Sequence, residues 1–260
     1  MKIAVTGKGG VGKTTVAAIL ARLYASEGHP VLAADVDPDA NLGAALGFTE
    51  EELALITPIS KMRKLIAERT GAGAETYGKF FKINPKVDDI PDLLAKEKNG
   101  VRLLVLGTVE TGGSGCVCPE HVVLKQVISH LILRREDVVI LDMEAGLEHL
   151  GRGTTDVMDE FIVVVEPGAR SVQTYRQIEK LAGDLGVKTV RVVANKLRTP
   201  EDEAFIRESI PRENLLGMVH YSEDVAASDR AGRSPYDYSR ETVSEIQAIK
   251  ALIDRSTDKK

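Results

Sequence analysis

A glycine-rich stretch near the start of the sequence has the residue types and spacing to bind a phosphate chain. Residues 7–14 read GKGGVGKT, a full match to the pattern G-x-x-x-x-G-K-[ST]. Glycines let several backbone N–H groups point at one anion, and a helix beginning where the loop ends adds partial positive charge. We expect Lys13 to reach the β- and γ-phosphates of a nucleoside triphosphate, and the Thr14 hydroxyl to hold Mg²⁺. The sequence therefore predicts nucleotide binding by Gly9, Gly10, Val11, Gly12, Lys13, Thr14 and Thr15.

Acidic residues follow the next predicted strand, at the edge of the sheet where a phosphate site needs them. Residues 30–35 read PVLAAD, and the run Asp37-Pro-Asp-Ala-Asn41 comes shortly after. Hydrolysis of a triphosphate needs one group that positions water and another that supports the metal. We predict that Asp37 orients the attacking water, and that Asp35 or Asn41 supports Mg²⁺ through water. A solvated acidic turn is the alternative for this run.

A further carboxylate closes another apolar run. Residues 137–142 read DVVILD, and Asp142 matches the carboxylate that supports Mg²⁺ opposite a phosphate loop. Gly146, in the segment that follows, offers an N–H for the γ-phosphate, so this segment is a candidate sensor of the bound nucleotide. A solvated strand end is the alternative.

Asn195 and Arg198 indicate which base is bound. They follow the apolar run 189–194 in the order Asn-Lys-Leu-Arg, and an Asn at a strand end can hydrogen-bond a purine edge. Guanine-specific proteins carry N-K-x-D, in which the Asp pairs with two guanine donors. Here Arg198 holds that place and would leave those donors unpaired, so we predict ATP as the nucleotide. A plain strand-end Asn, with the base held by other residues, is the alternative.

The two cysteines of the chain lie close together, directly before a predicted helix. Cys116 and Cys118 follow a Gly-Gly-Ser-Gly stretch, and Pro119 suits the first position of a helix. At a helix N-terminus the dipole favours the thiolate, which is the metal-binding form. A tetrahedral thiolate site needs four ligands, so we predict that two copies of the chain each supply two. Buried, unreactive cysteines and a redox pair are the alternatives.

The composition argues against several classes of partner. The 260-residue chain has a formal net charge of −5, so no overall positive charge attracts nucleic acid or anionic lipid. The first apolar run is short and leads into the phosphate loop, unlike a signal peptide, and no apolar stretch is long enough to cross a bilayer. Two cysteines are too few for a disulfide framework. We expect a soluble cytoplasmic protein with neither a nucleic-acid nor a membrane partner.

Seven apolar runs and the helical patterns between them must position these residues. The runs are nearly continuous in Val, Ile, Leu and Ala, which is typical of strands covered on both faces. Their alternation with helices predicts an α/β fold: a doubly wound, mostly parallel sheet flanked by helices, with ligands at the carboxyl ends of the strands. The predicted strands are residues 2–6, 30–35, 101–106, 137–142, 161–166, 189–194 and 215–219. The predicted helices between them are residues 14–24, 119–133, 170–185 and 201–209.

We predict a single domain over residues 1–260, with an insertion at about residues 43–100 packed on its surface. Within the insertion, residues 53–69 look helical up to Gly71, and residues 79–91 look irregular. The insertion is either a structural cover or a surface on which a partner docks. A C-terminal helix over 241–253 is expected to pack one face on the core, formed by Val243, Ile246, Ile249, Leu252 and Ile253.

Together these motifs resemble the deviant Walker A ATPases, over essentially the whole chain. The resemblance rests on the extra lysine Lys8 in the phosphate loop, the run DVDPDANL that begins at Asp35 and the run DMEAG that begins at Asp142. This group of P-loop NTPases, of the SIMIBI class, includes the MinD and ParA proteins, the arsenite-pump ATPase and the nitrogenase iron protein. The resemblance implies an ATPase that closes as a homodimer around ATP, in which Lys8 reaches the phosphates bound by the opposite subunit. Lys8, Lys13 and Asp37 are then its expected catalytic residues.

A narrower resemblance comes from the run Cys-x-Cys-Pro-Glu, the insertion and the segment after Asp142. These features are similar to those of the CooC-type nickel-insertion ATPases, which mature carbon monoxide dehydrogenase. The resemblance implies an ATP-dependent metallochaperone that binds Ni²⁺ or Zn²⁺ between subunits at Cys116 and Cys118 and serves a carbon monoxide dehydrogenase-type client. ATP, metal or both would drive its dimerisation. His121 and His149 are candidates to assist metal transfer, or else are polar surface residues.

Other members of the group suggest two further functions. The nitrogenase iron protein places a second Cys where this chain has His149, which argues against a bridging iron–sulfur cluster. A MinD/ParA-type positioning ATPase would bind a membrane or DNA, and the acidic balance and the Cys-x-Cys pair weigh against it. An Mrp-like iron–sulfur cluster carrier also uses two close cysteines, but usually as C-x-x-C.

Overall fold

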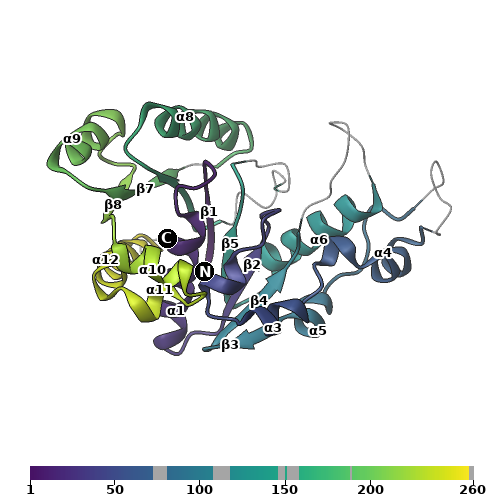
Figure 1. The fold of residues 1–260 in the computed structure, drawn as a ribbon. Coiled ribbons are helices and arrows are strands. Elements are labelled where there is room, and N and C mark those ends of the chain that lie inside the picture. The colour runs from purple at the N-terminus through teal and green to yellow at the C-terminus, as the bar shows by residue number, and fades with distance from the viewer. Residues whose placement is uncertain (73–80, 108–117, 146–149, 151–157, 188, 258–260) are drawn as a thin grey trace.

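The protein is built around one eight-stranded sheet (Figure 1). The computed structural model describes residues 1–72, 81–107, 118–145, 150, 158–187 and 189–257. The strand order is β3-β4-β2-β5-β1-β6-β7-β8, and every neighbouring pair is parallel except β3 with β4. The strands are β1 (Lys2–Gly7), β2 (Val31–Asp35), β3 (Lys96–Lys98), β4 (Val101–Val105), β5 (Val138–Asp142), β6 (Glu160–Val165), β7 (Val190–Leu197) and β8 (Leu215–His220).

Helices cover both faces of this sheet, because the central strands are apolar on both sides. In β1, Ala4 faces one hydrophobic cluster, while Ile3 and Val5 face the other. The helices are α1 (Lys13–Ser26), α2 (Leu42–Ala45), α3 (Glu50–Ala54), α4 (Arg63–Thr70), α5 (Ile90–Leu94), α6 (Pro119–Arg134), α8 (Ala169–Asp184), α9 (Pro200–Ser209), α10 (Glu223–Arg230), α11 (Pro235–Tyr238) and α12 (Arg240–Thr257), with the 3₁₀ helix η1 (Ile59–Lys61).

The two layers of helices confirm the predicted doubly wound α/β fold. Val127 of α6, Tyr175 of α8 and Ile206 of α9 are buried in the cluster on one face. Leu20 of α1 and Ile249 of α12 are buried in the cluster on the other, and Figure 1 shows α8 and α9 well separated from α1 and α12. The parallel strands therefore end together at one edge of the sheet, where α/β proteins bind their ligands.

The segment between β2 and β4 differs from the prediction in two places. The single helix expected over residues 53–69 is wrong, because Pro58 cannot continue a helix and its residues divide among α3, η1 and α4. The expected end is right: Gly71 caps α4 in the left-handed conformation, with a φ of 74°. The short edge strand β3, which pairs with β4 through a turn at Asn99 and Gly100, was not predicted from the sequence.

The segment between β2 and β4 packs onto the hydrophobic core. Ile59, Ile66 and Ile90 are buried in the same cluster as the inner face of α6. These contacts join residues from η1, α4 and α5 to the core beside the sheet. The division into a single domain with an insertion at residues 43–100 stays our proposal.

The C-terminal helix α12 is longer than expected, and its buried face differs in one residue. Ile246, Ile249 and Ile253 are buried as predicted, but Leu252 is 41% exposed. Lys250 is buried instead, because its ammonium contacts the carboxylates of Glu27 and Asp254 at 2.6 and 2.8 Å. A paired lysine can therefore occupy a face that the sequence pattern assigned to apolar side chains.

Candidate functional site

The phosphate loop lies between β1 and α1, as its sequence predicts. Gly12 has a φ of 94°, and a Cβ at this position would lie 2.2 Å from the Nδ2 atom of Asn195. Only glycine fits this combination of a left-handed backbone and a close neighbour. The Asn195 amide in turn donates a hydrogen bond of 2.8 Å to the carbonyl of Val11. Asn195 thus supports the loop, and its predicted contact with a purine base stays a prediction.

Lys13 and Asp37, both predicted catalytic residues, lie together at the base of the loop. The Nζ atom of Lys13 is 3.4 Å from an Oδ atom of Asp37, and the two side chains are only 7% and 14% exposed. The other Oδ atom of Asp37 accepts a hydrogen bond of 3.0 Å from the backbone N–H of Asp39. The structure therefore brings the predicted water-orienting carboxylate to the lysine that should contact the β- and γ-phosphates.

Asp35 shapes the segment that carries Asp37. One of its carboxylate oxygens accepts a hydrogen bond of 3.2 Å from the backbone N–H of Asp37, and the other accepts one of 2.9 Å from Leu42. Burial raises the pKa of Asp35 to about 6, although these two hydrogen bonds and the nearby Lys13 oppose the shift. Asp35 therefore holds the turn after β2 in place and lies close to the predicted magnesium site.

Asp142 is the carboxylate best suited to a metal ion among the predicted residues. It lies at the end of β5, it is 1% exposed, and neither oxygen has a hydrogen-bond partner of normal geometry within the described residues. Burial raises its pKa to about 7, while the neighbouring Thr14 hydroxyl lowers it to a lesser extent. A buried carboxylate beside a threonine hydroxyl fits Mg²⁺, which takes oxygen ligands from few side chains and the rest from phosphates and water.

The phosphate loop and several of the predicted residues line one end of a cavity of about 1030 Å³, whereas Val11, Asp35 and Asp142 are not part of its wall. Gly9, Gly10, Gly12, Lys13, Thr14, Thr15, Asp37, Asn41 and Asn195 all contribute to its wall. Lys8 does not belong to the residues identified as lining it, although it lies in the same loop. The volume is large enough for a nucleotide-sized ligand, and the phosphate loop, a lysine and carboxylates meet at one end.

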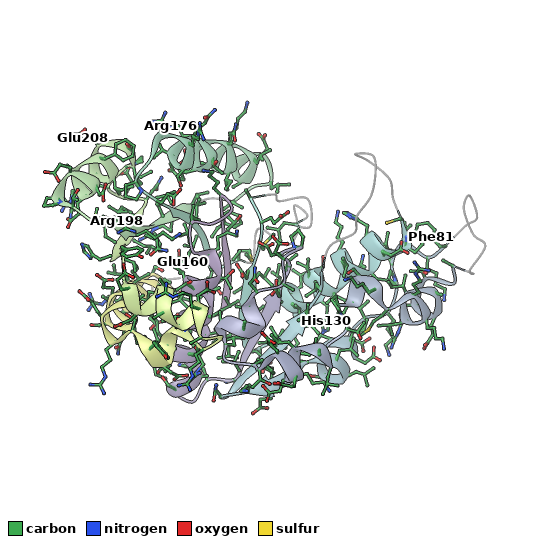
Figure 2. The ribbon with its side chains drawn as sticks, in the orientation of Figure 1. Phe81, His130, Glu160, Arg176, Arg198 and Glu208 are labelled. Carbon is green, nitrogen blue, oxygen red and sulfur yellow. The ribbon has the colours of Figure 1, made fainter. Side chains whose placement is uncertain are left out.

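The other end of the cavity is formed by residues that the sequence analysis did not select. His220 is the last residue of β8, Tyr221 follows it, and Arg233 lies between α10 and α11. Arg198 lies below α9 in the view of Figure 2, and its guanidinium carbon is 3.5 Å from the centre of the Tyr221 ring. The rule that ligands bind at the carboxyl ends of parallel strands could have pointed to His220 and Tyr221.

Cys118, one of the two predicted metal ligands, lies at the N-terminus of α6. It caps the helix: its Sγ atom accepts a weak hydrogen bond of 3.5 Å from the N–H of His121, and Pro119 is the first helical residue. Its side chain is half-buried. Cys116, Gly146 and His149 lie outside the described residues. The helix terminus places the Cys118 sulfur where the dipole favours a thiolate.

The described residues contain no cluster of three or more His, Cys, Asp or Glu side chains able to hold a metal ion. Their helices also include none that is long and apolar enough to cross a bilayer. A thiolate metal site would thus need ligands beyond Cys118 and its described neighbours.

Comparison with known proteins agrees with this geometry. The model of the CobQ/CobB/MinD/ParA nucleotide-binding domain matches residues 2–236. The chain is 49% identical over 253 residues to CooC, a carbon monoxide dehydrogenase accessory protein of Rhodospirillum rubrum, with 97% of this chain and 96% of CooC covered. It is 47% identical over 252 residues to an uncharacterized ATP-binding protein of Methanocaldococcus jannaschii, with 96% of each chain covered.

Two solved structures show that the fold is shared more widely. A putative plasmid partition protein of Borrelia burgdorferi, bound to AMPPNP, matches with a TM-score of 0.67 at 16% identity, with 98% of each chain covered. The septum site-determining protein MinD of Pyrococcus horikoshii, complexed with Mg-ADP, matches with a TM-score of 0.63 at 22% identity, with 98% of this chain and 95% of MinD covered. The family match and the close relatives identify this chain as an ATP-binding ATPase that belongs to the CobQ/CobB/MinD/ParA family, in the group that includes CooC.

Proposed function

We propose that this ATPase is an accessory protein of a carbon monoxide dehydrogenase and inserts nickel into the active-site cluster of that enzyme. The observation that carries this proposal is the 49% identity to CooC, which extends over nearly the whole of both chains. An ATP-driven protein works where ATP is supplied, so we place its action in the cytoplasm.

Binding and hydrolysis of ATP use the residues at and beside the phosphate end of the cavity. Lys13 neutralises the β- and γ-phosphates, while Thr14 and Asp142 hold Mg²⁺, which supplies positive charge to the phosphates, with Asp35 in support. Asp37 orients a water molecule whose oxygen attacks the γ-phosphorus as the bond to the ADP oxygen breaks. Because Asp37 already lies 3.4 Å from Lys13, it needs no large movement to reach this place.

The metal half of the mechanism uses two copies of the chain. We propose that ATP brings them face to face and that Lys8, which lies outside the cavity wall of its own subunit, contacts the phosphates held by the partner. Cys116 and Cys118 of each copy then supply four thiolates to one ion. Nickel is the proposed cargo, and thiolates also bind Zn²⁺ strongly. Hydrolysis separates the pairs, so the affinity for metal depends on the bound nucleotide.

A reconstituted activation assay tests the function. Nickel-free carbon monoxide dehydrogenase is incubated with a limiting amount of Ni²⁺, this protein, and ATP or ADP, and carbon monoxide oxidation is then measured. We expect activation with ATP and the wild-type protein, and little with ADP or with Cys116→Ala/Cys118→Ala. Leu252→Ala, a change at an exposed position on α12, serves as the control. Equal activation by the double cysteine variant would refute the proposed transfer.

A further inference from the structure

We propose that Lys196 is a positioning residue of the ATPase, which holds the tip of the phosphate loop in its binding shape. Its ammonium donates a hydrogen bond of 2.5 Å to the carbonyl of Gly10. The side chain also lines the nucleotide cavity. The inference concerns nucleotide binding and hydrolysis alone, so it holds whatever the cargo or client of this ATPase is.

The backbone of Lys196 is in a conformation that lysine rarely adopts. Its φ is 63°, in the left-handed region, where a Cβ crowds the following carbonyl. Asn99 is the other non-glycine residue with a positive φ in the described part of the chain, and its hairpin turn requires that conformation. Lys196 lies in a strand instead, and backbone strain of this kind is concentrated at functional sites.

The strain has an identifiable result: two consecutive side chains reach the same loop. In a regular strand, Asn195 and Lys196 would point to opposite faces of the sheet. The pairing of β7 with β8 shifts register between Ala194 and Leu197, at the residues concerned. Asn195 consequently donates to the carbonyl of Val11 and Lys196 to the neighbouring carbonyl of Gly10.

These two hydrogen bonds fix the direction of two successive peptide groups in the phosphate loop. The carbonyl of a trans peptide points away from the N–H of the next residue. Holding the Gly10 carbonyl toward β7 therefore turns the N–H of Val11 away from β7, where it donates a hydrogen bond of 3.4 Å to the carbonyl of Lys8 within the loop. Holding the Val11 carbonyl in the same way turns the N–H of Gly12 away from β7.

The tip of the loop has little other support. Gly9 and Gly10 are exposed, and a Cβ on either would meet no described atom within 4 Å. Glycines in such surroundings can adopt many backbone conformations, so an unsupported tip would have to be ordered by the nucleotide itself. The Lys196 ammonium removes part of that freedom in advance, which should strengthen phosphate binding.

Three substitutions test this role, because they distinguish the effect of the ammonium group from that of the strained backbone conformation. In Lys196→Asn, the asparagine tolerates a positive φ, but its side chain is too short to reach Gly10. Lys196→Gly relieves the strain and removes the side chain. Lys196→Arg keeps a cation of sufficient reach. For each variant we would measure the Kd for ADP by calorimetry, the KM and kcat for ATP, and the melting temperature without nucleotide.

We expect Lys196→Asn and Lys196→Gly to weaken ADP binding and raise KM by about tenfold, the scale of one charge-assisted hydrogen bond at a half-exposed site. Their melting temperatures should equal or exceed that of the wild type, because strain is relieved. Lys196→Arg should stay within about twofold of the wild type in Kd and KM. The proposal is wrong if the Asn and Gly variants bind ADP as tightly as the wild type, or if Arg does not preserve affinity.

Discussion

At the scale of single residues, the site contains buried carboxylates that an ordinary protein core would avoid. Asp35 and Asp142 are 0% and 1% exposed, and burial raises the pKa of both. Asp35 uses its oxygens to accept two backbone hydrogen bonds, whereas no backbone N–H of the described residues donates to Asp142, which lies beside the Thr14 hydroxyl. The buried Asp142 carboxylate therefore lowers the free energy of unfolding when no ligand is bound. Binding of Mg²⁺ and nucleotide should restore that stability to the protein.

Replacing Asp142 by Asn should stabilise the protein in the absence of Mg²⁺ and nucleotide. The folded pKa of about 7 lies above the ordinary aspartate value of 3.8, so between these two values the folded state holds its proton where the unfolded state has lost it. The contribution of Asp142 to the free energy of unfolding is then greatest at low pH, and it falls as the pH rises between the unfolded and the folded pKa. We expect Asp142→Asn to raise the melting temperature by roughly 4 °C near pH 8, and by progressively less as the pH falls toward about 4.

The same variant should lose the stabilisation that the wild type gains from Mg²⁺ with ADP. Scanning calorimetry of both proteins, with and without the two ligands, measures this difference. A melting temperature below that of the wild type at pH 8, in the absence of ligands, would contradict the account of Asp142.

Asp37→Asn should separate nucleotide binding from hydrolysis. If Asp37 orients the attacking water, its loss lowers kcat by about 100-fold or more, the usual scale for such a group. Binding of ADP should be unchanged or tighter, because the carboxylate that lies 3.4 Å from Lys13 no longer competes with the phosphates. Steady-state kinetics and calorimetry give the two quantities.

Asp39→Asn is the matched control, since it removes an equal charge from an exposed neighbouring position. Its kcat should stay close to that of the wild type. Similar losses in both variants would show that the effect is one of overall charge.

At the scale of elements, the sequence predicted the central sheet well and the segment between β2 and β4 poorly. Buried parallel strands are visible as apolar runs, and the fold places all of them as expected. Pro58 interrupts the helical pattern over residues 53–69, and the prediction of a single helix did not take it into account. The Asn99-Gly100 pair is a strong hairpin signal that was overlooked because the charged edge strand β3 has no apolar pattern.

The hairpin itself can be tested at Gly100. Its φ is 77°, and a Cβ there would lie 3.4 Å from the Cβ of Ala25. Gly100→Ala should therefore destabilise the protein by about 1 kcal/mol, or about 3 °C in melting temperature, with no change in ADP affinity. Gly183→Ala in α8 is the control and should instead stabilise the protein, because a Cβ there meets no described atom within 4 Å and alanine favours the helix. A stability gain at Gly100 would contradict the assigned turn.

The candidate site, like the fold, could be predicted from the sequence only in part. The phosphate loop and the strand-end carboxylates could be identified because their residue types and spacing are specific. The use of Asn195 and Lys196 to hold the loop could not, because it depends on a left-handed backbone and a register shift in β7 that no sequence pattern reveals. The far wall of the cavity is built from polar residues of ordinary types, and only the topology brings them there.

At the scale of the whole molecule, the proposed function joins two sites in one chain. The nucleotide cavity lies at the carboxyl ends of the central strands, and Cys118 begins a helix on one face of the same sheet. Lys8 lies in the phosphate loop but not in the wall of the cavity. We propose that Lys8 gains its function when a second copy approaches, and that the cysteine pair, which would supply half of a tetrahedral site, does so too.

The number of metal ions bound by each assembly tests this central proposal most directly. The wild type and Cys116→Ala/Cys118→Ala would be loaded with Ni²⁺ or Zn²⁺, with ADP or a non-hydrolysable ATP analogue. Light scattering after size exclusion gives the mass of each species, and elemental analysis gives its metal content. We predict about one ion for every two chains, found in a dimer formed with the ATP analogue and lost in the double variant. One ion per chain in a monomer would contradict the shared site.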